Sequence, residues 1–243
     1  MTTVTRPTTG LIPQSLARML LLRRSRGTAR TVYSIVRKVT TLPIVRRCTY
    51  FCASDLYRLQ LSKATSPTRT PKSFVVRQAT GDDLPALADY FGDRALVETR
   101  LERGDVCVIT LCQDKVGAAV WLTVGPGEYH DDWDDLRCVC RLPAHVAWTY
   151  DGRGTKLGAW GTLMAKLPDL LQEHGVTELD TLIDCNGWKS LDSHKSLSYE
   201  NIGTIARFGA FGLMQSVCKP RRGKWRFLPT RLGEIEFAGR RGV

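Results

Sequence analysis

Apolar residues follow helical spacing in the first part of the chain and mostly strand-like spacing after it. Before residue 62, apolar positions recur every three or four residues between arginines, as at Val32, Ile35 and Val36. Residues 62–73 are rich in Ser, Thr and Pro without an apolar pattern, which predicts a linker. We therefore expect four parts: a basic, partly disordered amphipathic helical region at 1–61, a linker at 62–73, a folded domain at 74–230 and a basic tail at 231–243.

Within the expected domain, β-branched runs alternate with amphipathic stretches. Strands are predicted at 74–80, 105–112, 115–124, 137–150 (bent at its proline) and 176–184, and as a final hairpin over 201–218. Helices are predicted after Thr80, through Ala95–Glu102, from Leu157 to a stop at His174-Gly175, and over 187–197. This order, β-α-α-β-β-β-α-β-α-β-β, predicts an α/β fold with a mixed sheet (α+β), preceded by the basic helical extension.

Positive charge is concentrated at the N-terminus. The formal net charge is +11, and residues 1–72 hold fourteen Lys or Arg and a single acid, Asp55, so the remainder is nearly neutral. This distribution predicts a basic arm on a globular module rather than a nucleic-acid-binding core. Three interpretations of the arm are open: it packs on the module, lies on an anionic membrane surface, or binds nucleic-acid phosphates non-specifically. We favour packing or membrane-surface contact over nucleic acid, and Tyr33, Tyr50, Phe51 and Tyr57 indicate packing rather than a free tail.

The eight cysteines are scattered, with no CxxC pair and no metal-ligand spacing. We therefore expect reduced cysteines and no bound metal. The longest apolar run in the first 70 residues, MLLL, is far shorter than the roughly 20 residues of a membrane-spanning helix. We expect a cytoplasmic protein, with peripheral attachment to a membrane surface as an alternative. The Arg-, Ser- and Thr-rich start is also typical of an organellar transit peptide.

The stretch DGRGTKLGAW, residues 151–160, joins an expected strand to an expected helix. The first amides of a helix are unpaired and carry partial positive charge, so such a turn suits a diphosphate. Arg153 and Lys156 would add charge-assisted contacts, and Thr155 would add a hydroxyl. The alternative is that Gly152 and Gly154 only form a tight strand-to-helix turn.

The element order and two motifs together resemble the GCN5-related N-acetyltransferases (GNAT) over about residues 74–215. Arg153-Gly154-Thr155-Lys156-Leu157-Gly158 stands where that family has Arg/Gln-x-x-Gly-x-Gly/Ala. The later stretch CNGWKSLDSHKSLSYENIG resembles the family's Asn, Ser and "lysine-leucine-glycine-phenylalanine" run. Two positions depart from the pattern: Lys156 replaces the central glycine, and Ser198-Tyr199 replace the terminal Gly-Phe.

The resemblance implies transfer of an acyl group, most simply acetyl from acetyl-CoA, to an amine by direct attack on the thioester, without a metal. Backbone amides of Ala147–Thr149 would polarise the thioester carbonyl. The residues that the resemblance places around the acyl-CoA are Ala147, Trp148, Thr149, Arg153, Gly154, Thr155, Lys156, Leu157, Gly158 and Asn186.

The same reaction requires an acid for the departing thiolate and a base for the attacking amine. In the family a tyrosine of the later helix often supplies the acid, and His194 and Tyr199 lie nearest that position. For the base, the loop Glu128–Asp135 offers Glu128 and His130, because carboxylates attract a cationic amine. That loop is otherwise interpreted as solvated, as an oxygen-ligand metal site, or as a contact for the basic arm.

We therefore expect an acyl-CoA-dependent N-acyltransferase with an amine acceptor of unspecified identity. Two alternatives stay open. Lys156 and the missing Gly-Phe favour a related module that binds acyl-CoA or a protein partner without catalysis. The basic arm favours a membrane-surface or nucleic-acid adaptor in which residues 14–61 carry the activity.

Overall fold

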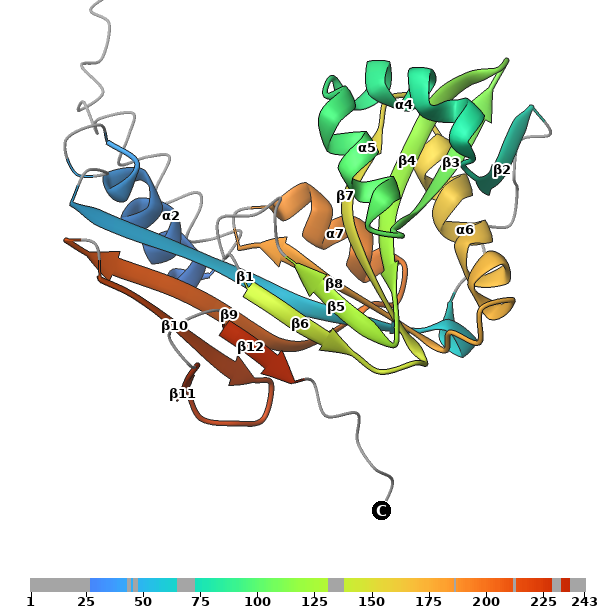
Figure 1. Cartoon of the computed structure of the whole chain (residues 1–243). Coiled ribbons are helices and arrows are strands. Elements are labelled where there is room, and N and C mark those ends of the chain that lie inside the picture. Colours follow the sequence, from blue (N-terminus) through green and yellow to red (C-terminus); the bar gives the residue numbers. More distant parts are fainter. Residues whose placement is uncertain are drawn as a thin grey trace, which may run out of the picture.

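A nine-stranded sheet forms the centre of the molecule, and a three-stranded sheet lies against one of its faces (Figure 1). The computed structural model describes residues 27–42, 45, 48–64, 73–130, 138–185, 187–211, 213–228 and 233–236. The strand order is β11-β10-β9-β1-β8-β7-β4-β3-β2 in the large sheet and β12-β6-β5 in the small one. In the large sheet only β7 and β8 run parallel. The predicted mixed α/β (α+β) class is confirmed.

The strands are β1 (Thr49–Gln60), β2 (Phe74–Gln78), β3 (Val106–Cys112), β4 (Lys115–Val124), β5 (Gly127–His130), β6 (Cys138–Leu142), β7 (Val146–Gly154), β8 (Glu178–Asp184), β9 (Glu200–Ala210), β10 (Leu213–Pro220), β11 (Arg226–Phe227) and β12 (Gly233–Glu236). The α-helices are α2 (Thr28–Thr40), α4 (Leu84–Phe91), α5 (Arg94–Glu102), α6 (Ala159–Gln172) and α7 (Trp188–Ser196), and the 3₁₀ turns are η1 (Leu61–Lys63) and η2 (Gly81–Asp83). Between β2 and β10 these elements follow the predicted order, except that β5 is added and the predicted strand 137–150 is divided into β6 and β7.

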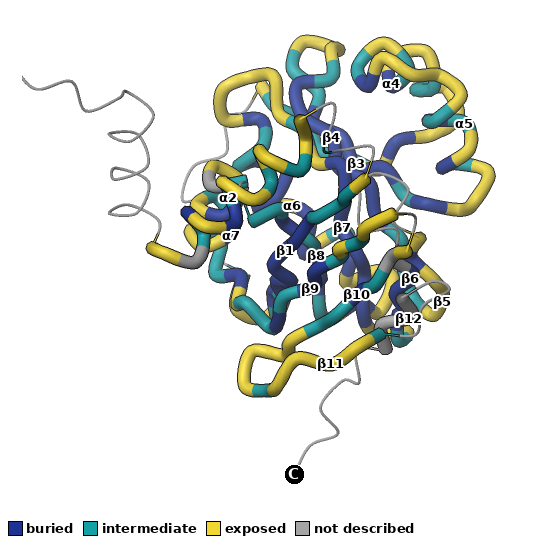
Figure 2. The backbone as a smooth tube through the Cα atoms, turned by 90° about the vertical axis from the view of Figure 1, so that its left-hand side faces the viewer, coloured by how far each residue is buried: buried dark blue, intermediate teal, exposed yellow. Residues whose placement is uncertain are grey.

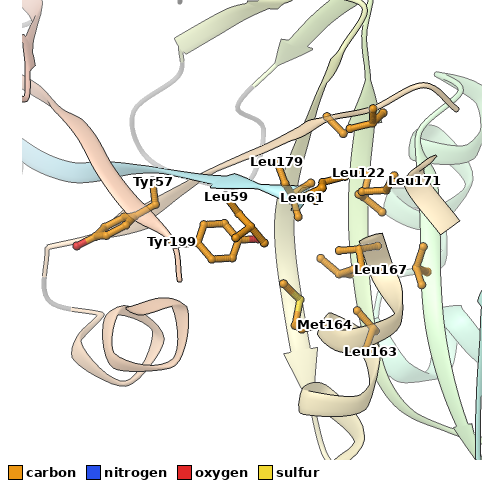
Figure 3. Packing of buried hydrophobic residues seen from close by; sticks show 14 of the residues in the cluster. Tyr57, Leu59, Leu61, Leu122, Leu163, Met164, Leu167, Leu171, Leu179 and Tyr199 are labelled. Atoms are coloured by element: carbon orange, nitrogen blue, oxygen red, sulfur yellow. The ribbon is translucent and has the colours of Figure 1, made fainter. Parts of the chain in front are cut away.

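Helix α6 shows why the apolar periodicity predicted its element well. Its buried residues recur at three- and four-residue spacing and pack against the sheet. Figure 3 shows this packing, with Leu163, Leu167 and Leu171 directed toward Leu122 and Leu179 of the strands. The helix begins after Gly158, whose φ of 82° is a left-handed conformation that glycine adopts without strain, and Pro168 lies inside it, as predicted.

Residues 49–60 were expected to be part of the basic helical region, and that prediction is wrong. They form β1, which pairs with β8 on one side and β9 on the other, in the middle of the large sheet. A central strand is buried on both faces, so its apolar residues lack the period-two alternation that identifies a half-buried strand. The expected linker at 62–73 therefore does not separate two structural units.

The charge of Arg58 in β1 is balanced by acids that are distant in sequence. Its Nε and Nη2 each lie 2.7 Å from the carboxylate oxygens of Asp180, and its Nη1 lies 2.6 Å from Glu178 Oε2. Both acids belong to β8, the neighbouring strand. An arginine that suggests a surface helix in the sequence is thus held inside the sheet by ion pairs.

Two other segments differ from the predictions. The run 137–150 is two strands in different sheets, because the chain leaves β6 at Pro143 and enters β7 at Val146. The expected basic tail contains β12, which pairs in parallel with β6. The basic arm is confirmed as helical where the structure describes it before β1, in α2.

The helices cover both faces of the large sheet. Residues of α4 and α5, such as Leu87 and Val97, share a core cluster with Tyr129 and Cys140 of the small sheet. Helices α6, α7 and α2 pack on the opposite face, where α2 lies beside β1. In Figure 2 the buried backbone follows the strands between these two layers. Side chains on opposite faces of the sheet can therefore line a common cavity only where two neighbouring strands separate.

Candidate functional site: a cavity between two separating strands

Strands β7 and β8 separate halfway along their length. They pair in parallel from Val146 and Glu178 to Thr149 and Thr181. Beyond that point β7 pairs only with β4, and β8 pairs only with β1. The facing edges of the two strands therefore end in a gap, where backbone N–H and C=O groups of β7 are available to a ligand.

A cavity of about 610 Å³ occupies this gap. One wall is aromatic and belongs to the face of α4, α5 and the small sheet: Tyr129, Trp148 and Tyr150. The other wall is formed by Thr149, Trp160 and His194, from β7, α6 and α7. The cavity is thus lined from both faces of the sheet, which lets two molecules approach one point from opposite sides.

The edge of β7 inside the cavity carries a β-bulge. Trp121 pairs with Tyr150 and Ala119 with Arg153, so Asp151 and Gly152 together oppose one residue of β4. Asp151 has a φ of 44°, in the left-handed region that costs a non-glycine residue energy. Bulges of this kind re-aim backbone groups next to binding sites.

Buried ion pairs hold the bulge in place. Asp151 accepts hydrogen bonds from Arg100 Nη1 at 2.8 Å and from Arg153 Nε at 2.8 Å. Arg100 and Asp151 are 0% and 1% exposed. The Arg100 guanidinium lies between the rings of Trp121 and Tyr150, 5.4 Å and 4.9 Å from their centroids. The negative charge of Asp151 is therefore already balanced, and Asp151 acts as a support for the bulge.

Arg153 was expected to contact a phosphate; it lines the cavity, and its guanidinium is engaged within the protein. Its guanidinium bonds to Asp151, donates to the backbone oxygen of Phe91 at 3.3 Å and lies over the Phe91 ring. All of these contacts are on the side of α4, away from the N-terminus of α6.

Gly152 and Gly154 leave room for the indole of Trp160. A Cβ on Gly152 would lie 2.5 Å from Trp160 Cη2, and one on Gly154 would lie 3.0 Å from Trp160 Cβ. Both glycines are therefore explained by a close approach of helix α6 to β7. This agrees with the simpler interpretation of the turn, in which these two glycines serve local packing.

The turn at residues 155–158, before α6, uses some of its hydrogen-bond donors within the protein and leaves others for an anion. The amides of Thr155 and Lys156 both donate to the backbone oxygen of Gly117, and Thr155 Oγ1 points to the same atom at 3.3 Å. These groups are occupied within the protein. The amide of Ala159, the first residue of α6, also donates, to the backbone oxygen of Lys156 at 3.1 Å. The next amides of this 14-residue helix follow, and Lys156, Leu157 and Gly158 are exposed beside them. Lys156 is thus placed to supply charge where two expected amide contacts are missing.

The amides of Ala147–Thr149 were expected to polarise the thioester. The structure pairs these residues with β4 on one side and β8 on the other. Trp148 and Thr149 line the cavity and Ala147 does not. The unpaired edge of β7 begins only at Tyr150, so the bulge at Asp151 and Gly152 takes the place expected for Ala147–Thr149.

His194 lines the cavity and is 8% exposed. Its Nδ1 lies 2.7 Å from the backbone oxygen of Ser190, which can only accept, so Nδ1 carries the proton and Nε2 carries the lone pair. Burial lowers the pKa of His194 from its ordinary value of 6.5. At neutral pH the ring is therefore neutral and suited to act as a base, whereas the sequence suggested an acid.

Tyr199 does not line the cavity. It is buried near Tyr57 and Leu59, as Figure 3 shows, and its ring lies edge-on to His194 with centroids 4.8 Å apart. Burial raises its pKa above the ordinary range. These positions make Tyr199 a support for the His194 ring.

Glu128 and His130 lie away from the cavity. Both are on β5, where Glu128 contacts Arg141 at 3.3 Å and His130 at 3.6 Å on an exposed surface. Tyr129 between them points the opposite way, lines the cavity and stacks on Trp148 with centroids 4.9 Å apart. The geometry gives no support for either residue as the base. Asn186 and residues 131–137 lie outside the described residues.

Sequence reasoning missed most of the cavity lining, including Tyr129, Tyr150 and Asp151. Alternation along β5 could have indicated Tyr129, since it is flanked by two polar residues. No sequence pattern signals the positive φ of Asp151. Among the described residues, no group of three or more His, Cys, Asp or Glu side chains is placed to hold a metal ion.

Comparisons with known proteins give structural likeness only. No family model matches the sequence, and no curated protein matches it. Solved structures similar to this chain are mostly GNAT acetyltransferases.

Of these, a GNAT from Kribbella flavida is 12% identical, with a TM-score of 0.45, 70% of this chain covered and 62% of that one. The tandem GNAT protein from the clavulanic acid biosynthesis pathway is 12% identical, with a TM-score of 0.45, 78% of this chain covered and 72% of that one. A functionally unknown protein from Staphylococcus epidermidis is 9% identical, with a TM-score of 0.48, 72% of this chain covered and 65% of that one. The chain thus spans less than two thirds of two of these three proteins.

Proposed function

We propose that the protein is an acyl-CoA-dependent N-acyltransferase that transfers an acetyl or similar group to an amine. The observation that carries the proposal is the cavity between β7 and β8, lined from both faces of the sheet and edged by the bulge at Asp151–Gly152. The resemblance of the turn and of the 185–203 stretch to GNAT motifs supports the same reaction.

The residues on the α6 side of the cavity would bind acyl-CoA, an extended acyl donor whose pantetheine arm is joined to a nucleotide by a diphosphate. The exposed turn and the amides that follow Ala159 in α6 would hold the diphosphate, with Lys156 adding a positive charge. The unpaired edge of β7 would bind the amide groups of the pantetheine arm, in the manner of an added strand. At the bulge, backbone N–H groups would polarise the thioester carbonyl, which is the function first expected of Ala147–Thr149.

The acceptor would approach from the aromatic side, past Tyr129, Trp148 and Tyr150. Nε2 of neutral His194 would take the proton of the amine as the new C–N bond forms. The C–S bond breaks, the thiolate leaves with the electron pair and is protonated by solvent, and His194 returns its proton to water. Ser190 holds the imidazole through Nδ1 in the tautomer that this step requires.

Calorimetry with acetyl-CoA, followed by a free-thiol assay with a panel of amines, tests the proposal. We expect binding and amine-dependent thiol release. A Lys156→Ala variant should bind acetyl-CoA more weakly, by about tenfold, because one charge-assisted phosphate contact is lost. Lys166→Ala is the matched control, since this exposed lysine lies on α6 outside the cavity lining. Failure to bind acetyl-CoA at millimolar concentration overturns the proposal.

A second function rests on one observation, the occupation of the Thr155 and Lys156 amides by Gly117. A module with fewer phosphate donors would bind acyl-CoA without transferring its acyl group. Binding without thiol release for any amine in the panel would favour this alternative.

A further inference from the structure

Helix α2 turns its polar side chains toward the protein and its apolar side chains away from it. Arg30, Tyr33 and Arg37 make hydrogen bonds of 2.8–3.1 Å to Asp55, to Asp184 and to the backbone oxygen of Phe51, respectively. The opposite face carries aliphatic residues that are each at least 38% exposed: Val32, Ile35, Val36 and Val39. Amphipathic helices of soluble proteins ordinarily show the reverse orientation.

Exposed apolar side chains continue from α2 onto the neighbouring sheet edge. The tip of the β9–β10 hairpin lies at the start of β1, where the amide of Phe211 donates to Cys48. Phe208 pairs with Phe51, whose ring contacts Tyr33 of α2, so Phe208 faces the side that α2 covers. The exposed apolar residues of this edge are Phe208, Phe211, Leu213 and Phe227, at 39%, 84%, 80% and 76%.

Basic side chains predominate in this region. No acid precedes Asp55 in the sequence, and none lies between Glu200 and Glu234. The exposed basic side chains on this side are Lys38 on α2 and, around the β10–β11 turn, Lys219, Arg221, Arg222 and Lys224, of which Arg221 lies 3.7 Å from the exposed Glu200. We call α2 together with the β9–β11 edge the basic-apolar surface.

We propose that the basic-apolar surface docks on an anionic lipid membrane. Basic side chains attract anionic headgroups, and the aliphatic face of α2 can enter the boundary of the acyl chains. A second copy of the chain would present the same positive charge and be repelled. Residues 1–26 would be repelled as well, since they contain five arginines and no acid. The phosphates of a nucleic acid would neutralise the basic side chains, but a nucleic acid offers no apolar phase in which Val32, Ile35 and Val39 could be buried.

The mode of binding would be attachment at the surface. Within the described part of the chain, no helix has the length and apolar character needed to cross a bilayer. The proposal does not require acyl transfer, because the residues of the basic-apolar surface do not line the cavity; the two meet at the hydrogen bond from Tyr33 to Asp184, which does line it.

Sedimentation of the full-length protein with vesicles tests the proposal. We expect binding to phosphatidylcholine vesicles with about 30% phosphatidylserine, weak binding to phosphatidylcholine alone, and loss of binding at high salt. The double variant Ile35→Ser/Val39→Ser should bind at least about tenfold more weakly, since it removes two exposed aliphatic groups. Lys219→Glu/Lys224→Glu should weaken binding by a similar or larger factor. Val75→Ser is the matched control, because Val75 is 57% exposed at the opposite edge of the sheet.

Three results would overturn the proposal. The first is equal binding of wild type and Ile35→Ser/Val39→Ser to the anionic vesicles. The second is tighter binding to a single-stranded oligonucleotide than to those vesicles, which would identify a nucleic-acid surface. The third is a dimer in light scattering that Ile35→Ser/Val39→Ser dissociates, which would identify a second copy as the occupant.

Discussion

The chemistry of the cavity depends on which nitrogen of His194 carries the proton. Because Ser190 accepts from Nδ1, Nε2 is unprotonated and can act only as an acceptor until it is charged. The sequence indicated that His194 was near the reacting groups but not its tautomer, since the tautomer depends on a backbone oxygen one helical turn away. The tautomer of this residue is therefore set by the three-dimensional structure.

We expect kcat/KM to fall as the pH falls through the pKa of His194, which lies below 6.5 because of burial. The sign follows from the base role: protonation of Nε2 removes the lone pair that accepts the amine proton. An acceptor amine of low pKa keeps its own titration out of this range. His194→Asn should lower kcat by about 10²-fold or more and remove this limb of the profile.

His174→Asn is the control, since His174 is exposed at the end of α6. A profile that instead falls as the pH rises through the same pKa would indicate an acid, and would contradict the base role.

The Arg100–Asp151 ion pair should contribute far more to the free energy of unfolding than an exposed ion pair does. Arg100→Met leaves the buried Asp151 carboxylate with only Arg153, which should lower the free energy of unfolding by about 3–5 kcal/mol. Arg94→Met on the same helix removes an exposed pair with Glu98 and should cost less than about 1 kcal/mol. Urea denaturation of both variants measures the difference, and similar losses would show that burial of the pair does not stabilise the bulge.

At the scale of single elements, the packing of β7 on α6 depends on the absence of a side chain at Gly152. Gly152→Ala should destabilise the protein by about 1–3 kcal/mol, because the added methyl meets the Trp160 ring. Gly161→Ala is the control: nothing lies within 4 Å of its Cβ position, and alanine favours a helix. Thermal unfolding separates the two, and the double variant Gly152→Ala/Trp160→Leu should recover part of the loss.

We expect the fold to require the N-terminal region from β1 onward but not the residues before α2. Removing residues 1–26 leaves every described element in place, so we expect a folded protein. Removing residues 1–64 leaves β8 and β9 without the strand between them. Circular dichroism and gel filtration should then show an aggregated or unfolded chain, whereas a folded monomer would mean that β8 and β9 can pair directly.

For the molecule as a whole, the order of elements was predictable from the sequence, and the meeting of distant residues was not. Period-based patterns identified α6 and the β9–β10 hairpin, because each is decided by neighbours a few residues away. The position of β1 depends on pairing with β8 and β9, which no local pattern encodes. Of the predicted site residues, those that line the cavity are Trp148, Thr149, Arg153, Gly154 and His194. The bulge and the tyrosines of the aromatic wall come from tertiary packing and were not predicted.

Because the cavity is lined from both faces, donor and acceptor should be bound at the same time. Among the described residues that line it there is no cysteine, the most reactive group for a covalent acyl-enzyme. We therefore expect initial-rate plots against acetyl-CoA at several amine concentrations to intersect. Parallel lines would indicate a ping-pong reaction and would contradict direct transfer.

The central position of β1 also determines when the chain can fold during synthesis. Arg58 can form its hydrogen bond with Asp180 only after a further 122 residues have been synthesised. Asp55 can accept from Thr204 only after a further 149 residues. At about 5–20 residues per second, β1 is therefore outside the ribosome for several seconds or more before its partners exist. During that interval it is an unpaired apolar strand, so cells under heat stress should lose newly made protein well before the mature protein unfolds.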